Sequence, residues 1–133
     1  MVISGQDCLR YEREGYCLLA ERIGYSMYHQ STSLSAFANK TVKAKLTLLG
    51  NREYLITLCT EKRFYPVHYK IIDEKEDKVL YDNQQDDYLE SIGFILDRTR
   101  NVIIEAEALA EKAKLEDRVY PKCIGIYIQY RFP

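Results

Sequence analysis

The stretch DDYLESIGFILDRTRNVIIEAEALAEKAKL, residues 86–115, decides between two folds for this chain. Its apolar residues recur at helical spacing, on one stripe that runs from Leu89 to Ala113. Acidic residues cluster early in the stretch, while Lys112 and Lys114 come late, which suits the dipole of a helix. The pattern therefore predicts one long helix, and a helix of about 30 residues spans about 45 Å.

A hairpin over 92–104 is the competing interpretation of the same stretch. The apolar runs 94–96 and 102–104 flank a polar turn at 99–101, and Gly93 also weakens a continuous helix. We prefer the helix because the part after the turn is rich in Ala, Glu and Lys, which are strong helix formers.

The residues before this stretch predict a meander of antiparallel strands. Apolar and polar side chains alternate along four segments, which are 42–49, 53–60, 63–72 and 78–82. Short polar turns separate the segments, at Gly50-Asn51, Glu61-Lys62 and 73–77. Pro66 places the third segment at an edge or a bulge, because proline cannot donate to the ladder.

The two ends of the chain complete the expected architecture. Residues 7–28 show helical spacing of apolar residues, with Asp7 as the N-cap, and the hydroxyl-rich segment 30–35 is expected to be a loop. Residues 120–132 alternate as a final strand. We therefore expect a single α+β domain over 1–133. It combines an N-terminal helix, an antiparallel sheet of about four to five strands and a long helix before the last strand.

Composition and charge exclude some classes of partner. The 133 residues carry 19 basic and 20 acidic side chains, which gives a net charge of −1. A general nucleic-acid binder needs a surplus of Lys and Arg to displace phosphate counterions, so nucleic acid is not an expected partner. No run of about 18 apolar residues occurs, so a transmembrane helix and a membrane partner are not expected either.

The cysteines and the N-terminal residues bear on the cellular compartment. Cys8, Cys17, Cys59 and Cys123 are widely scattered, and residues 1–7 have neither the basic region nor the apolar core of a secretory signal. We therefore expect free, buried thiols in a reducing compartment, and hence a cytoplasmic protein.

The two histidines supply the only candidates for catalysis. Paired His-x-Ser/Thr motifs are typical of two-histidine phosphodiesterases, in which two imidazoles flank a phosphate. His29 begins one such motif, but the motif that begins at His68 has Lys70 in place of a hydroxyl residue. The weak candidate set for acid–base work on a phosphate-containing substrate is therefore His29, His68 and Lys70.

No motif indicates a metal ion or a cofactor. A structural zinc site needs closely spaced Cys or His pairs, and the closest cysteines, Cys8 and Cys17, are nine residues apart. The chain has six glycines and no glycine-rich nucleotide-binding loop. We expect no cofactor and no metal.

The predicted helix over 86–115 leads to the functional expectation. It would extend beyond a sheet of four or five strands, so its apolar stripe needs cover from a second copy or a partner chain. The 12 tyrosines and no tryptophan suit half-buried sheet faces and interfaces. We therefore expect a non-enzymatic protein-interaction or assembly module, an adaptor or a homo-oligomer such as a dimer. The alternative is a small enzyme or ligand-binding protein that acts on an anionic substrate through His29, His68 and Lys70.

Overall fold

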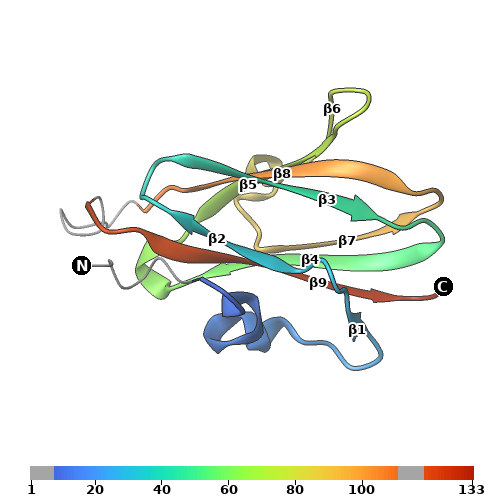
Figure 1. Cartoon of the computed structure of the whole chain (residues 1–133), viewed down its shortest axis with the longest axis horizontal. Coiled ribbons are helices and arrows are strands. Elements are labelled where there is room, and N and C mark those ends of the chain that lie inside the picture. Colours follow the sequence, from blue (N-terminus) through green and yellow to red (C-terminus); the bar gives the residue numbers. More distant parts are fainter. Residues whose placement is uncertain (1–7, 111–118) are drawn as a thin grey trace.

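The computed structural model describes residues 8–110 and 119–133, and nine antiparallel strands in two facing sheets dominate that part of the chain (Figure 1). The five-stranded sheet contains β1 (Ser26–Met27), β2 (Thr32–Ala36), β4 (Arg52–Thr60), β7 (Ser91–Leu96) and β9 (Lys122–Arg131). The four-stranded sheet contains β3 (Thr41–Leu48), β5 (Val67–Asp73), β6 (Lys78–Asp82) and β8 (Arg100–Ala108). Figure 1 looks onto the side where β2 and β3 lie, with the four-stranded sheet above and the N-terminal segment below.

The order of strands defines the edges of both sheets. The order is β1-β9-β4-β7 in the five-stranded sheet, where β2 also pairs with β9, and β3-β8-β5-β6 in the four-stranded sheet. Short 3-10 segments lie before and between the strands: η1 (Tyr11–Arg13), η2 (Gly15–Ala20), η3 (Lys62–Phe64) and η4 (Asn83–Asp86). The predicted α+β class is therefore wrong, and the described part of the chain is a β-sandwich.

The stretch that decides the fold forms strands, so the predicted long helix is wrong. β7 and β8 occupy most of 91–108, while 111–115 lies outside the described residues. The apolar residues at 92, 94 and 96 and at 102, 104 and 106 also alternate with a period of two, and β-branched and aromatic residues among them favour strands. The competing hairpin interpretation is right that this stretch contains two strands, but it is wrong that they pair with each other. β7 pairs with β4, whereas β8 pairs with β3 and β5.

Two further expectations near the N-terminus are corrected. The helix expected over 7–28 is wrong, because the described residues there form η1, η2 and β1, with Gly24 at a left-handed φ of 90°. The loop expected over 30–35 is wrong as well, since β2 runs through it. On β2 Ser33 and Ser35 alternate with the inward-facing Leu34 and Ala36, which is why a hydroxyl-rich segment still forms a strand.

The strands expected over 42–49, 53–60, 78–82 and 120–132 are confirmed by β3, β4, β6 and β9, and β5 confirms the later part of 63–72. Their order as a simple meander is wrong. Only β5 and β6 pair as consecutive strands of the four, since β3 and β5 lie in one sheet and β4 lies in the other. Pro66 precedes β5 rather than interrupting it.

The turn between β3 and β4 crosses from one sheet to the other. A Cβ on Gly50 would lie 2.6 Å from the Cα of Arg98 and 2.8 Å from the amide nitrogen of Thr99, so the turn after β7 leaves room only for glycine. Asn51 then takes a left-handed φ of 57°, which asparagine tolerates. The turn chemistry that predicts a hairpin thus serves a connection between sheets.

The core lies between the two sheets and takes one face of each strand. On β4 and β9 it takes Ile56, Leu58, Ile124, Ile126 and Ile128, all fully buried. Tyr69, Ile71 and Ile104 meet them from the four-stranded sheet. The register of each strand is selected by burial of its apolar side chains, because a slip of one residue would turn those side chains outward.

Two disulfides fasten the N-terminal segment to the outer face of the five-stranded sheet. Cys8 is bonded to Cys123 of β9, and Cys17 to Cys59 of β4, with Cα–Cα distances of 5.5 and 5.3 Å. Gly125 lies beneath the second bond, where a Cβ would stand 2.6 Å from the Sγ of Cys17 and 2.8 Å from the Sγ of Cys59.

The disulfides overturn the expected free thiols and the expected cytoplasmic location. Disulfides form and persist in oxidising compartments, such as the periplasm, the secretory pathway and the cell exterior, and are rare where thiols are kept reduced. The bonds therefore point to one of those compartments. Separately, no helix within 8–110 and 119–133 has the length and apolar character needed to span a bilayer.

Candidate functional site

The sandwich is open along two sides, and each side is formed by one edge strand from each sheet. β2 and β3 flank one opening, and β6 and β7 flank the other. An edge strand presents unpaired backbone N–H and C=O groups that can pair with another chain. The two sides are therefore the places where this fold can add a strand or admit a ligand.

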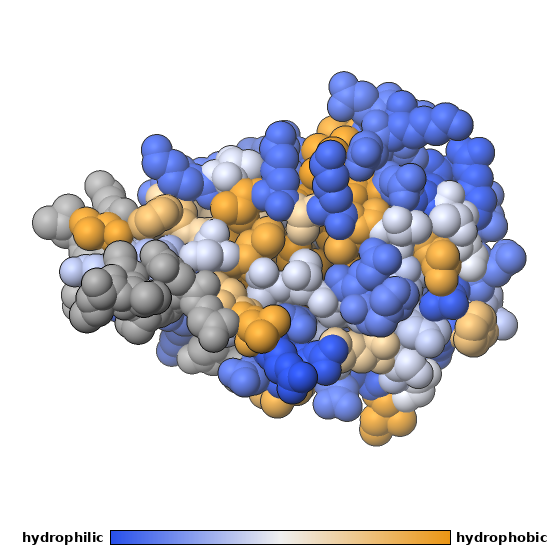
Figure 2. Space-filling model, in the orientation of Figure 1, coloured by the Kyte–Doolittle hydropathy of each residue, from blue (hydrophilic) through white to orange (hydrophobic). Residues whose placement is uncertain are grey.

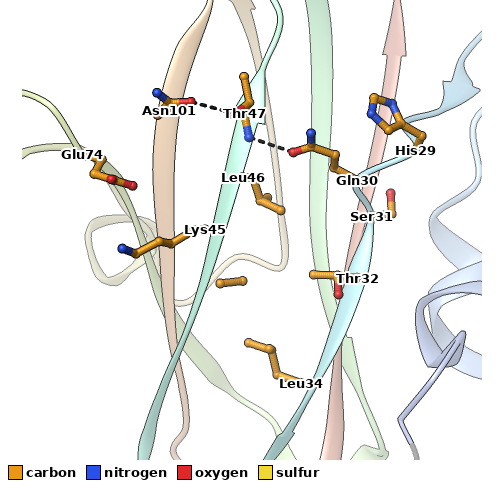
Figure 3. A pocket seen from close by; sticks show the side chains of 11 residues that line it. His29, Gln30, Ser31, Thr32, Leu34, Lys45, Leu46, Thr47, Glu74 and Asn101 are labelled. Atoms are coloured by element: carbon orange, nitrogen blue, oxygen red, sulfur yellow. Dashed lines mark hydrogen bonds between the residues drawn. The ribbon is translucent and has the colours of Figure 1, made fainter.

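The β2/β3 side carries an open hollow of about 770 Å³ along β3. Figure 3 shows its lining residues on both sides of that strand, with Lys45, Glu74 and Asn101 toward β8 and Ser31 and Thr32 toward β2. In Figure 2 apolar surface appears in the opening between the strands, and hydrophilic side chains line its β3 rim. The hollow is thus mixed in polarity and broadly exposed.

Side chains close the β3 edge at one end of this hollow. The backbone N–H of Thr47 donates to Oε1 of Gln30 at 2.7 Å (Figure 3). The hydroxyl of Tyr28 donates to the backbone C=O of the same residue. Because outward-facing residues alternate along an antiparallel edge, Lys43 and Lys45 share the orientation of Thr47. The rest of the edge therefore carries two lysines, which oppose pairing with a further strand.

The β6/β7 side has the opposite character. Between these strands lies a cavity of about 190 Å³ lined by nine residues, among which only Tyr81 has a polar side-chain atom: Leu48, Ile71, Leu80, Tyr81, Ile92, Gly93, Phe94, Leu96 and Val102. The hydroxyl of Tyr81 donates to a carboxylate oxygen of Asp86 at 2.6 Å. The cavity wall is accordingly apolar and uncharged.

The β7 edge also lacks the protection seen on β3. None of its six residues, Ser91–Leu96, is charged or proline, and the Ile95 side chain is 65% exposed. The N–H of Leu58 on β4 donates to the C=O of Glu90 at 3.0 Å, so even-numbered residues of β7 bond to β4. By alternation, the backbone groups of Ser91, Gly93 and Ile95 face outward.

One buried side chain holds the chain between β6 and β7 in place. Asn83 is fully buried; its Oδ1 accepts from the N–H of Tyr69 at 2.8 Å. Its Nδ2 donates to the C=O of Val67 at 2.8 Å and to that of Leu89 at 3.1 Å. Asn83 therefore fixes the entry to β7 relative to β5.

The residues predicted for catalysis lie in two separate hollows. His29 lines the hollow along β3, with its ring 4.8 Å from that of Tyr28. His68 and Lys70 lie on the outer face of β5 and line a smaller hollow of about 100 Å³, whose lining does not include His29. The structure thus brings His68 and Lys70 together and places His29 elsewhere.

His68 is already engaged within its own sheet. Its Nε2 lies 2.8 Å from Oδ1 of Asp82, and its ring packs edge-to-face with that of Tyr88, with the two ring centroids 5.6 Å apart. Burial tends to raise the pKa of Asp82, but the N–H of Gln84 and the His68 ring outweigh it and hold that pKa below its usual range. The described residues contain no group of three or more His, Cys, Asp and Glu side chains placed to hold a metal ion.

Tyrosines supply much of the core and one surface cluster. Tyr28, Tyr54 and Tyr69 are fully buried, and burial raises the pKa of Tyr54 to about 12. At the end of β9, the Arg52 guanidinium lies 4.5 Å from the centroid of the Tyr130 ring and 5.1 Å from that of the exposed Phe132. The tyrosine-rich composition predicts tyrosines on half-buried sheet faces and interfaces, but it does not locate this cluster.

Sequence reasoning also missed the β7 edge. The available signal is the uncharged run 92–96, but Ile92 and Leu96 of that run also fit the apolar stripe of the predicted helix. An apolar run shows that side chains can be buried, but it does not show which strand will stand at the edge of a sheet.

Comparisons with known proteins give little to add to this geometry. No family model matches the chain, and no curated protein matches it. A solved structure, the crystal structure of Aeromonas hydrophila PliG, a periplasmic lysozyme inhibitor of g-type lysozyme, aligns with 83% of this chain and 89% of its own. The TM-score is 0.43 and the sequence identity 8%, a likeness too low to establish a shared fold or function.

Proposed function

We propose that this chain is a non-enzymatic protein-assembly module of an oxidising compartment, and that β7 pairs antiparallel with β7 of a second copy. The observation that carries the proposal is an edge strand of six residues with no charge and no proline, and with an exposed isoleucine. Soluble proteins usually protect such edges, so an unprotected apolar edge favours a partner strand.

The outward backbone groups restrict how two copies can pair. Ser91, Gly93 and Ile95 must form the hydrogen-bonded pairs across the new ladder. A two-fold axis at Phe94 meets this condition and sets Gly93 of each copy opposite Ile95 of the other. The ladder then continues the five-stranded sheet into the second copy.

In this register Gly93 has a role in pairing, although the fold of a single copy does not need a glycine there. A Cβ at Gly93 would meet only ordinary contacts, the nearest being the C=O oxygen of Tyr54 at 3.7 Å. The fold of one copy therefore does not require glycine there. In the paired form, the large side chain of Ile95 crosses over a position without a side chain, which suits close cross-strand packing.

Charges at the two ends of β7 favour a second copy as the partner. Glu90 precedes the strand, and Asp97 and Arg98 follow it; with the two-fold axis at Phe94, antiparallel copies set Glu90 of each copy opposite Arg98 of the other at both ends. Burial raises the pKa of Glu90, and no cation pairs with it among the described residues. Arg98 forms an ion pair with Glu76 at 3.6 Å in which both side chains are well exposed, and such a surface pair contributes little and is readily exchanged.

Sedimentation velocity over a concentration series tests the proposal. We expect the wild-type protein to pass from monomer to dimer as its concentration rises, with a dissociation constant in the micromolar range, typical of a small interface. Ile95→Lys should weaken the dimer by roughly tenfold or more, because it places charges on the shared ladder. A strictly monomeric wild-type protein at about 1 mM would overturn the proposal.

Ser35→Lys is the matched control, since Ser35 is an exposed residue of β2, the opposite edge strand of the same sheet. It should leave the dimer unchanged, and equal weakening by both lysines would argue against β7 as the interface. Gly93→Val tests the register: it should weaken pairing if Gly93 faces Ile95. A stronger dimer would instead indicate that Gly93 faces Gly93.

A further inference from the structure

The cavity between β6 and β7 is an apolar volume on the inner side of the edge strand β7, which supplies part of its lining. Its lining comes from both sheets, with Ile71 and Val102 on the four-stranded sheet and Ile92 and Phe94 on β7. Leu80 of β6 also lines it and is 40% exposed, so the cavity reaches the surface beside that side chain. From this geometry we propose that the cavity is a binding site for a small, neutral, apolar molecule. The inference goes beyond the proposed assembly.

The polarity of the lining excludes a charged ligand. No charged side chain lines the cavity, and Tyr81 directs its hydroxyl to Asp86. Burial, together with the Asp86 carboxylate, raises the pKa of Tyr81 to about 12, so the phenol stays neutral at physiological pH. An ionised group placed in the cavity would lose its hydration with nothing to replace it, which is costly.

The size of the cavity sets the size of the ligand. Apolar cavities of about 150 Å³ stay dry and bind benzene or xenon. A cavity of about 190 Å³ therefore suits one aromatic ring with a short substituent, or an aliphatic chain of similar bulk. Such a ligand gains from contacts that the empty cavity leaves unmade.

The hollow along β3 lacks these properties. It is larger and broadly open, and polar side chains such as Lys45, Glu74 and Asn101 line it. A small apolar molecule there would remain in contact with water. The inference is therefore specific to the β6/β7 side.

Methyl-detected NMR titration with toluene tests the inference, with benzoate as the charged counterpart of similar size. The Ile95→Lys variant is used alongside the wild-type protein, so that failure of self-association does not affect the result. We expect saturable shifts of the methyl groups of Ile71, Ile92 and Val102 with toluene in both proteins, and none with benzoate. Absence of saturable shifts with toluene, or equal shifts with benzoate, would overturn the inference.

A pair of tryptophan variants on β6 supplies the structural control. Leu80→Trp should fill the cavity from its mouth and weaken toluene binding by about tenfold or more. Val79→Trp changes the neighbouring residue, which is 49% exposed and does not line the cavity, and should bind toluene like the wild-type protein. The chain has no tryptophan, so each variant also reports its own environment by fluorescence. Equal binding by the two variants would place toluene elsewhere and overturn the assignment.

The same titration distinguishes ligand binding in the cavity from pairing through β7. If the second copy fills the cavity, these methyl signals should shift with protein concentration in the wild-type protein only, and toluene should not move them. That outcome would overturn the ligand site and leave β7 pairing intact. Toluene binding by a strictly monomeric protein would do the reverse.

Discussion

Strands β3 and β7 stand at edges of the same sandwich, yet their surfaces differ. β3 carries Lys43 and Lys45, and at Thr47 its backbone groups are taken by side chains from the β1–β2 connection. β7 carries no charge, and no side chain within residues 8–110 and 119–133 forms a hydrogen bond with its outward backbone groups. The difference indicates that this fold protects one open side with charge and side-chain hydrogen bonds and leaves the other, where we propose the partner and ligand sites, without that protection.

Removing the Cys8–Cys123 disulfide, which lies on the β2/β3 side, should cause the largest loss of stability. Cys123 lies opposite Ser35 of β2, and the bond joins residues 115 apart in sequence. By loop entropy, Cys8→Ala/Cys123→Ala should lower the unfolding free energy by about 5 kcal/mol. Guanidinium denaturation measures the loss.

The shorter disulfide is the control for that variant. Cys17 and Cys59 are 42 residues apart, so Cys17→Ala/Cys59→Ala should cost somewhat less, about 4 kcal/mol. A loss under about 1 kcal/mol for either pair would show that the bonds are not what fastens this side.

Asn83→Ala is the corresponding destabilising variant on the β6/β7 side. It leaves a buried N–H and two C=O groups without their partners, so the unfolding free energy should fall by about 3 kcal/mol. Urea denaturation of dilute, monomeric protein measures it. Gln84→Ala, at the next and exposed position, should change stability by less than about 0.5 kcal/mol; similar losses for the two would contradict the role of Asn83.

Lys43→Val/Lys45→Val should make the β3 edge resemble β7. With both edges unprotected, copies can join through either side, so species larger than the dimer should form at roughly tenfold lower concentration than in the wild-type protein. Small-angle scattering and sedimentation measure their size. Thr41→Val, which removes a hydroxyl but no charge from the same strand, is the control. If the double variant forms nothing larger than the wild-type dimer, charge is not what protects β3.

The smallest expected effect concerns pH and the β5–β6 hairpin that supports the β6 edge. The Glu76 N–H and the Arg100 guanidinium hold the pKa of Asp73 below its usual range. Ionised Asp73 therefore stabilises the folded state above the ordinary carboxyl range, and that stability is lost as the pH falls through the lowered pKa.

Asp73→Asn should accordingly flatten the fall in unfolding free energy below about pH 4. Stability measured between acidic and neutral pH checks the expectation. Glu74→Gln, which changes the adjacent exposed carboxylate, should keep the wild-type profile. Parallel profiles for wild type and Asp73→Asn would contradict it.

The sequence was informative about strands and poor about their partners. Alternation identified β3, β4, β6 and β9, because burial of one face imposes a period of two wherever a strand lies. It could not show that β3 and β4 lie in different sheets, since Gly50-Asn51 suits a hairpin and a crossing between sheets equally well at the level of residue type. Pairing depends on contacts far apart in the sequence.

The failure at 86–115 has a related cause. The apolar residues at 92, 96 and 106 satisfy a helical stripe and also the alternation of β7 and β8, so spacing alone did not decide. The disulfides were missed because their partners are 42 and 115 residues apart. The candidate site could not be predicted at all, because an edge exists only once the order of the strands is known.

Gly125 and the Cys17–Cys59 bond above it have a consequence for quality control during folding. β9 pairs with β4 so that Gly125 lies opposite Cys59, and the neighbours of that glycine in β9 are Ile124 and Ile126. A slip of one residue would put an isoleucine side chain where even a single Cβ comes within 2.6 Å of sulfur. The bond can therefore close only when β9 and β4 are correctly aligned, so its formation reports the register of that central pair.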